Sequence, residues 1–234
     1  MSRIVVLAGE GEYESATTMK PVADSIAEHL DAHLTYRTPD VLEDWPSFPS
    51  SSFGSLESLH GADLLIFYTR FRILPDAELQ ALAEYLDQGG NLLALRTSTH
   101  AFRPRPESDW SGWTERFAAT YIGTEWTRHH GHTSTTDITT VAQHPVTDGL
   151  PAHFHVDSWL YVSTPPPDAE VLLWGDPVDP EKESEPSPVA WVRQLGTQRI
   201  FYTSLGGQSD LQDPIVLRLL ENAAAWCVEA EATR

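Results

Sequence analysis

The sequence predicts an α/β fold, with a doubly wound, mostly parallel sheet and helices on both of its faces. Three short apolar runs, at residues 3–8, 62–68 and 91–95, have the continuous hydrophobic character of strands that are buried on both sides. Helical patterns separate these runs, and strands that alternate with helices form right-handed parallel crossovers. The chain has 234 residues, 41% of them hydrophobic, which suits one large domain spanning 1–234.

The N-terminal half contains two clear strand–helix units. The run at 3–8 is followed by Gly-Glu-Gly-Glu and then by residues 17–30, where apolar side chains recur at helical spacing. The run at 62–68 is followed by a predicted helix that begins after Pro75 and ends at the glycine pair that starts with Gly89. The next strand follows that pair directly, as expected for a compact crossover.

The second half mixes further strands with helical patterns and has no internal repeat. We predict helices at 113–121 and 214–228, an exposed strand at 133–141, and strands at 171–174, 189–192 and 199–203. Two stretches rich in proline with serine or acidic residues, about 40–58 and 176–188, are predicted to be loop excursions within the same domain. The aromatic residues of the first excursion can pack on their own domain, close over a ligand or dock on a second copy of the chain.

The composition argues against two classes of partner. There are 15 Lys and Arg residues against 34 Asp and Glu residues, which gives a formal net charge of −19. A surface this acidic repels phosphate backbones and anionic lipids, so we expect neither a nucleic-acid nor a membrane partner. No apolar run reaches membrane-spanning length and no secretory leader pattern precedes the first strand, so we expect a cytoplasmic protein.

Polar side chains follow four of the predicted strands. In open parallel sheets the ligand crevice lies beyond the carboxyl ends of the strands, so we expect these side chains to meet around one crevice. They are Glu10, Glu12 and Tyr13 after the first strand, Thr69, Arg70 and Arg72 after the second, Arg96, Thr97, Ser98, Thr99 and His100 after the third, and Ser204, Gly206, Gly207 and Gln208 after 199–203.

Three of the ten histidines lie close together, at His129, His130 and His132. On an extended segment His130 and His132 point to one face and His129 to the other. Such a pair can share a proton-transfer role or bind a divalent metal, for which Glu12 or His100 is the candidate third ligand. Acid–base chemistry, metal binding and plain surface histidines are the interpretations that remain open.

The sequence lacks the motifs of two enzyme classes. The Gly-x-Ser/Cys-x-Gly elbow is absent around Ser98, and the sole cysteine, Cys227, lies in the C-terminal helical pattern. We therefore expect neither a disulfide nor cysteine-based glutamine hydrolysis. The stretch from Gly9 to Glu12 places acids where a phosphate loop needs bare backbone amides, which argues against a nucleotide ligand.

Seven stretches, spread in order over nearly the whole chain, match the pattern of one known family. They lie at 9–13, 69–75, 95–102, 129–132, 144–150, 188–191 and 199–206. On these stretches the chain resembles the ThuA-like (trehalose utilisation) family. The resemblance implies a flavodoxin-like fold of the class I glutamine amidotransferase-like superfamily, without the amidotransferase cysteine. It also implies the handling of disaccharides or their 3-keto derivatives. Many members have Gly-Ile-His-Ser-Ala after the third strand, and here Arg96 stands at the position of that histidine.

The resemblance and the convergent residues together favour chemistry on a small keto sugar, with no required cofactor. A ketone acidifies the neighbouring C–H bond, so isomerisation or elimination needs a base and a donor that holds the enolate oxygen. The candidate catalytic residues are His130, His132, Glu12 and His100; the candidate substrate-binding residues are Tyr13, Arg70, Arg72, Arg96, Thr97, Trp126, His129 and Gln208; His130 and His132 are the candidate metal ligands. Trp126 or Trp159 is expected to stack on the face of a pyranose ring.

Two other functions are compatible with the same residues. A sugar-binding or regulatory module would keep the crevice without catalysis, and ligand-induced thermal stabilisation without turnover would identify it. A metal-dependent hydrolase would use the histidine cluster, and metal analysis with activity measurements after chelation would identify it. A homo-oligomer is a further expectation, because the excursion at 40–58 carries aromatic residues with no helical or strand period to bury them.

Overall fold

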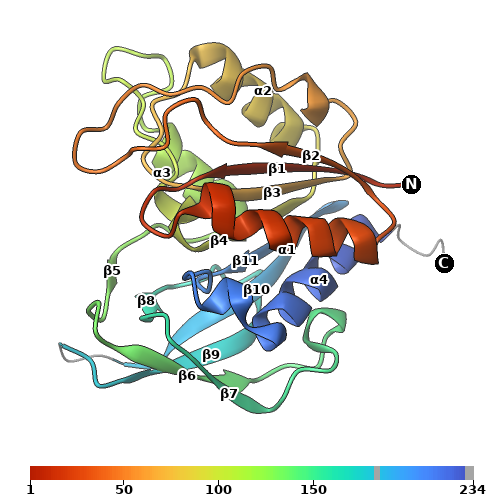
Figure 1. Cartoon of the computed structure of the whole chain (residues 1–234), viewed down its shortest axis with the longest axis vertical. Coiled ribbons are helices and arrows are strands. Elements are labelled where there is room, and N and C mark those ends of the chain that lie inside the picture. The colour runs from red at the N-terminus through yellow and green to blue at the C-terminus, as the bar shows by residue number, and fades with distance from the viewer. Residues whose placement is uncertain (182–184, 230–234) are drawn as a thin grey trace.

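In the computed structural model, which describes residues 1–181 and 185–229, nine strands form one mixed sheet and two more pair separately (Figure 1). The sheet order is β2-β1-β3-β4-β11-β10-β9-β6-β7. The strands are β1 (Arg3–Gly9), β2 (His33–Arg37), β3 (Leu64–Thr69), β4 (Leu92–Leu95), β5 (Arg128–His129), β6 (Thr135–Thr140), β7 (His153–Val156), β8 (Tyr161–Val162), β9 (Glu170–Val178), β10 (Ser187–Leu195) and β11 (Gln198–Thr203). The α-helices are α1 (Ser15–His29), α2 (Asp76–Asp87), α3 (Trp113–Phe117) and α4 (Pro214–Val228).

Half of the sheet is the doubly wound, parallel unit that the sequence predicts. β1 pairs in parallel with β2 and β3, β3 pairs in parallel with β4, and β4 pairs in parallel with β11. The remaining strands extend the sheet from β11 by antiparallel pairing. The α/β fold class is therefore confirmed, with an antiparallel extension on one side of the parallel strands.

Helices cover both faces because the side chains of the parallel strands alternate between two apolar clusters. In β1, Ile4, Val6 and Ala8 pack in the cluster that contains α1 and α4. Val5 and Leu7 point to the other face and pack in the cluster that contains α2 and α3. Figure 1 shows α1 and α4 in front of the strands. The core thus lies in two layers, one on each side of the sheet.

The helix boundaries follow local chemistry. α2 begins directly after Pro75 and ends before Gly89, whose φ is +87°, as the sequence predicts. α4 begins where the Asp213 carboxylate accepts the backbone N–H of Ile215 at 2.7 Å, which satisfies a donor at the helix start. Within the described residues, no helix is long and apolar enough to cross a bilayer.

Two predicted boundaries differ from the structure. The helix predicted at 113–121 ends at Phe117 and continues as a π-helical turn, Ala118–Ile122. The loop predicted at 176–188 is shorter, because residues 176–178 pair with β6 as the end of β9 and β10 begins at Ser187. Residues 182–184 of that loop lie outside the described residues. Backbone pairing with β6 therefore outweighs the acid- and proline-rich local sequence at this point.

The excursion at 40–58 packs against its own domain. Phe53 is buried, and its ring lies against Gly9 at the end of β1. The buried Arg72 guanidinium donates to the backbone carbonyls of Val41, Leu42 and Glu43. These bonds hold the excursion beside the carboxyl ends of β1 and β3. Its role in a homo-oligomer stays a prediction.

Candidate active site

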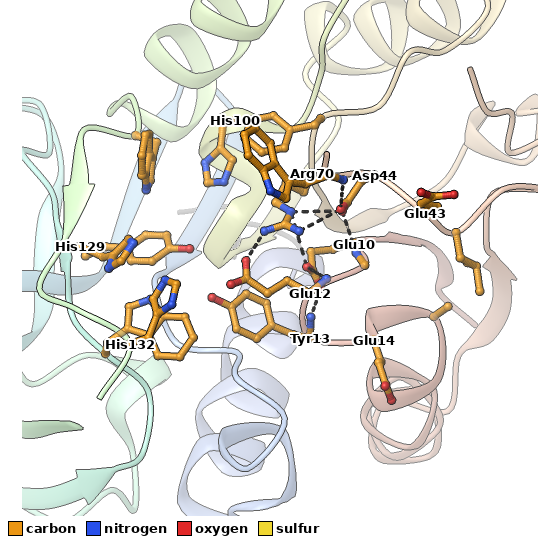
Figure 2. Close-up of a pocket in the computed structure, with 18 of the residues that line it drawn as sticks. Glu10, Glu12, Tyr13, Glu14, Glu43, Asp44, Arg70, His100, His129 and His132 are labelled. Carbon is orange, nitrogen blue, oxygen red and sulfur yellow. Dashed lines mark hydrogen bonds and ion pairs between the residues drawn. The ribbon is translucent and has the colours of Figure 1, made fainter. Parts of the chain in front are cut away.

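A cavity of about 880 Å³ lies at the carboxyl ends of β1, β3 and β4 (Figure 2). Residues 10–17 and 70–71, His100 and residues 42–45 of the excursion line it on one side, and residues between 126 and 161 line it on the other. The strand order runs outward in opposite directions from the β1–β3 pair, which makes this the topological switch point where such sheets bind ligands. Of the residues predicted from the sequence, it is lined by Glu12, Tyr13, Arg70, His100, Trp126, His129 and His132.

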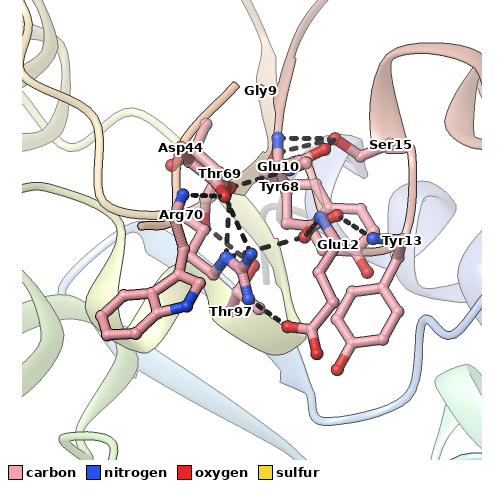
Figure 3. A network of polar contacts seen from close by, with 12 residues as sticks. Gly9, Glu10, Glu12, Tyr13, Ser15, Asp44, Tyr68, Thr69, Arg70 and Thr97 are labelled. Carbon is pink, nitrogen blue, oxygen red and sulfur yellow. Dashed lines mark hydrogen bonds and ion pairs between the residues drawn. The ribbon is translucent and has the colours of Figure 1, made fainter. Parts of the chain in front are cut away.

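Arg70 connects three carboxyl groups on the wall of this cavity (Figure 3). Its Nε and Nη2 atoms donate to the two oxygens of Asp44, at 3.1 and 2.8 Å, and its Nη1 atom donates to Glu12. Its Nε atom also lies 3.8 Å from a Glu10 oxygen. A guanidinium has five N–H groups, so these bonds to described residues use three and leave two for a ligand. Arg70 is therefore both a structural link and an available donor.

The Arg70–Asp44 pair fixes the excursion to the end of β3. Burial works to raise the pKa of Asp44, but the bonds from Arg70 and from the amides of Trp45 and Gly11 outweigh it and hold that pKa below its usual value. Burial likewise opposes the charge of Arg70, yet its bond to Asp44 and the charge of Glu12 raise the pKa of Arg70. Both groups are therefore charged over the physiological pH range, as a two-bond arginine–carboxylate pair requires.

Glu10 is a buried carboxyl group beneath the cavity wall. Its two oxygens accept the backbone N–H groups of Glu12 and Tyr13, so it shapes the turn that presents both side chains to the cavity. Burial raises the pKa of Glu10 to about 7, although the amides of Tyr13 and Glu12 and the charge of Arg70 act to lower it. Glu10 therefore titrates near neutral pH, unlike an ordinary exposed glutamate.

We expect Glu10 to make the protein less stable as the pH rises from about 4.5 to 7. In this window the folded protein keeps the Glu10 proton and the unfolded chain has released it, so the free energy of unfolding falls with pH. The full effect is about 3 kcal/mol above pH 7. Urea unfolding of the wild type and of Glu10→Gln across pH 4.5–8 measures it, and the variant should lack this part of the slope.

The control for this measurement is Glu14→Gln, at an exposed residue of the same cavity wall. Its stability curve should run parallel to that of the wild type. A Glu10→Gln curve that also runs parallel to the wild type would show that Glu10 titrates no differently in the folded protein and in the unfolded chain.

His100 enters the cavity from the turn after β4. Burial, together with the charges of Arg70 and Arg96, lowers the pKa of His100 to about 3. Its Nδ1 atom lies 3.2 Å from the Thr99 hydroxyl. When that hydroxyl donates to Nδ1, Nε2 carries the proton of the neutral ring. His100 is therefore a neutral hydrogen-bond donor at neutral pH, which is the form that can polarise a carbonyl oxygen.

The histidine cluster forms a different pair from the one predicted. His129 and His132 stack, with ring centroids 4.6 Å apart and planes at 21°, and both line the cavity (Figure 2). His130 is 1% exposed and does not line it, so the predicted pairing of His130 with His132 is wrong. The segment is not extended, because Gly131 has φ +106° and its N–H donates to His129 Nδ1 at 3.2 Å.

Three residues predicted to bind substrate are buried outside the cavity lining. Arg72 bonds the backbone of the excursion, as described above, and also the carbonyl of Gly9. Thr97 donates to the carbonyl of Thr69 at 2.9 Å. Arg96 is fully buried beneath the cavity, where the rings of Tyr13, Trp159 and Tyr161 surround its guanidinium at 4.5–4.9 Å. A fourth, Gln208, is exposed and is likewise absent from the lining. These four residues therefore have no direct access to a ligand in the cavity.

Comparison with known proteins gives the family of the chain. The model of a family described as trehalose utilisation, ThuA, matches residues 3–227. The chain belongs to the ThuA family. No curated protein matches it significantly.

Solved structures support the fold of this ThuA-family protein. It superposes on a protein described as ThuA-like from Parabacteroides merdae with a TM-score of 0.68, at 16% identity, over 100% of this chain and 92% of that one. A cytoplasmic protein from Salmonella typhimurium gives 0.58 at 14% identity, over 97% and 98% of the two chains. A glutamine amidotransferase from Thermotoga maritima gives 0.56 at 13% identity, over 98% and 99%. At these identities the likeness concerns the fold alone.

The ThuA-family chain has no nucleophile on the turn after β4. Arg96 occupies the start of that turn with φ +41°, and Ser98 is buried and donates to the carbonyl of Phe67. Cys227 is buried in α4, outside the cavity lining, and burial raises the pKa of its thiol. The residues that follow β4 therefore supply a buried cation and the imidazole of His100.

Histidine and carboxylate side chains do not converge on a metal site in the described part of this ThuA-family chain. No group of three or more His, Cys, Asp or Glu residues has an arrangement that could hold an ion there. His129 and His132 stack face to face instead of pointing their nitrogens at a common centre. The structure does not bring the predicted ligands His130 and His132 to one face, because His130 is buried and only His132 lines the cavity.

The structure adds Asp44 and Tyr161 to the predicted site of this family member, and it shows the surroundings of Glu10 and Trp159, which were already candidates from the sequence. The sequence shows Glu10 directly after the first predicted strand but does not predict that its side chain is buried. Asp44 lies in the excursion, where nothing in the local sequence distinguishes it from the other acids. Trp159 and Tyr161 come from the antiparallel half, and β8 brings Tyr161 opposite His129 on β5. Only tertiary structure places these last two beside the strand ends.

Proposed function

We propose that this ThuA-family protein binds a sugar in the cavity and enolises a ketone derivative of it. The observation that carries the proposal is that aromatic faces and convergent polar groups line the same cavity. Trp159 lies between Tyr13 and His132, with ring centroids at 5.7 and 4.7 Å. The volume of the cavity falls within the roughly 300–1,000 Å³ that is typical of small-molecule sites. Sugars present apolar C–H faces to such rings and hydroxyl groups to the polar residues between them.

The polar groups have the properties that enolisation needs. His132 is an exposed imidazole on one wall and serves as the base. Arg70 and the neutral His100 lie on the opposite wall, as Figure 2 shows, and donate to the ketone oxygen. Base and oxygen-binding donors therefore face each other across the space available to substrate.

The proposed reaction moves one proton at a time. His132 takes the proton from the carbon beside the ketone, and the C–H electron pair forms a C=C bond while the carbonyl electron pair moves to oxygen. Arg70 and His100 stabilise that oxyanion. In the isomerisation the oxyanion gains a proton, the hydroxyl group on the neighbouring carbon loses its proton, and the former carbonyl carbon takes the proton back from His132, so the ketone moves to the neighbouring carbon. In the elimination the oxyanion re-forms the C=O bond, the C=C bond shifts to the next carbon, and the substituent there leaves with its bonding electron pair.

Deuterium exchange tests this proposal directly. The protein is incubated with 3-keto-trehalose in D₂O, and NMR follows deuterium entering at the carbons beside the ketone. We expect exchange with the wild type and a loss of about 100-fold or more in His132→Asn, which lacks the base. Binding without exchange would identify a non-catalytic sugar-binding module instead.

His155→Asn is the matched control for His132→Asn. His155 is an exposed histidine on β7 that pairs with Asp137 at 2.7 Å and does not line the cavity. Its replacement should leave the exchange rate unchanged. A wild-type protein that neither binds nor exchanges the keto sugar would contradict the proposed function.

A further inference from the structure

Exposed apolar side chains gather at the mouth of the cavity. In the described part of the chain, six large hydrophobic residues are exposed, and three of them, Leu42, Trp45 and Trp126, line this cavity. Their exposed fractions are 49%, 63% and 42%. We call these three residues the outer rim. Such a concentration at one opening marks a contact surface, since exposed hydrophobic residues are otherwise scattered singly.

The outer rim continues the aromatic surface of the cavity interior. Ring centroids follow one another from Trp126 to His100 at 5.3 Å, from His100 to Phe71 at 5.0 Å, from Phe71 to Phe48 at 5.5 Å, and from Phe48 to Trp45 at 5.2 Å. Inside the cavity, His100 also neighbours Tyr161 at 6.5 Å. Trp126, His100, Phe71 and Trp45 line the cavity, so aromatic side chains lie both in its interior and at its mouth.

The residues that pack beneath Trp45 are held in defined positions. Phe48 and Phe71 have φ of +48° and +52°, in the left-handed region that non-glycine residues adopt only where the surrounding structure enforces it. The Arg103 guanidinium stacks on the Phe48 ring at 3.9 Å, and the Phe48 ring in turn contacts Trp45 edge-on. Trp45 is thus held in place although its own side chain is mostly exposed.

We propose that the outer rim is a second subsite, where Trp45 and Trp126 stack on the second ring of a glycoside whose first ring occupies the interior. This inference rests on the proposed function. A pyranose ring fits the chemistry of the rim, because it offers C–H faces to the indoles and hydroxyl groups to Glu43 and Arg70, which line the same opening. The rim thereby determines specificity for a two-ring ligand over a single sugar ring.

Calorimetric titration with trehalose and with methyl α-glucoside tests the subsite. Neither sugar carries a ketone, so neither is turned over during the measurement. We expect the wild type to bind trehalose about tenfold more tightly than the one-ring glucoside. In Trp45→Ala and Trp126→Ala the affinity for trehalose should fall about three- to tenfold, and the affinity for the glucoside should stay within twofold.

Trp174→Ala is the matched control, because Trp174 is an exposed tryptophan on β9 that does not line the cavity. It should leave both affinities unchanged. Equal wild-type affinities for the two sugars, or equal losses for both in the rim variants, would overturn the second subsite and leave the proposed function standing. Failure of the wild type to bind either of these sugars or 3-keto-trehalose would overturn the proposed function, and the subsite with it.

Discussion

Arg70→Leu should lower turnover of a keto sugar by about 100- to 1,000-fold. The substitution removes the only arginine that lines the cavity within the described residues, and a single oxyanion donor contributes about this much to catalysis. It also removes the two-bond partner of the buried Asp44 carboxylate, which keeps only the amides of Gly11 and Trp45 and the more distant Arg72, so the free energy of unfolding should fall by about 3 kcal/mol. The rate of deuterium exchange into 3-keto-trehalose and urea unfolding measure the two effects.

A second substitution separates the catalytic role of Arg70 from its structural role. Adding Asp44→Asn to Arg70→Leu removes the buried charge that has lost its two-bond partner, so most of the lost stability should return. Turnover should stay low, because the donor is still missing. The control is Arg218→Leu, at an exposed arginine of α4 outside the cavity lining. Recovery of turnover together with stability in the double variant would show that Arg70 acts only by holding the excursion.

Strands buried on both faces were predictable from the sequence. The runs at 3–8, 62–68 and 91–95 correspond to β1, β3 and β4 because burial on both sides requires a continuous apolar run. β2 was not predicted, since this edge strand is only half-buried and its sequence alternates polar and apolar side chains. β5, β7 and β8 are two to four residues long, which is too short for any periodicity to appear.

The position of the site was predictable, but the direction of each side chain was not. The rule that ligands bind beyond strand ends placed Glu12, Arg70 and His100 at one cavity. The same rule failed for Arg72 and Arg96, because left-handed residues redirect the chain directly after the strands. Phe71, with φ +52°, separates Arg70 from Arg72, and Arg96 itself has φ +41°. Such turns depend on tertiary packing and carry no local sequence signature.

Arg96→Ala should lower the free energy of unfolding by about 3–5 kcal/mol. The side chain is fully buried, and its Nη1 atom donates to the carbonyl of Ser204 at 2.6 Å. Alanine leaves a cavity the size of the side chain and a buried carbonyl without its donor. It also removes the cation from among the rings of Tyr13, Trp159 and Tyr161, which line the cavity, so the affinity for the proposed sugar ligand should fall as well.

Arg96→Met tests what the charge itself contributes, because methionine fills much of the same volume. We expect the free energy of unfolding of Arg96→Met to be about 2 kcal/mol below that of the wild type, which is a smaller loss than in Arg96→Ala. Removing the guanidinium also removes the cost of burying it, and this gain offsets part of the free energy lost with its hydrogen bonds. Arg199→Ala is the control, at a half-buried arginine that stacks on the Trp226 ring at 5.2 Å and donates to the Trp226 carbonyl at 2.5 Å, and it should cost about 1–2 kcal/mol, less than Arg96→Ala. Urea unfolding at one pH compares all three variants. If the methionine variant is as stable as the wild type, the hydrogen bonds and ring contacts of Arg96 only balance the cost of burying the guanidinium. The position of Arg96 beneath the cavity would then have to be explained by function and not by stability.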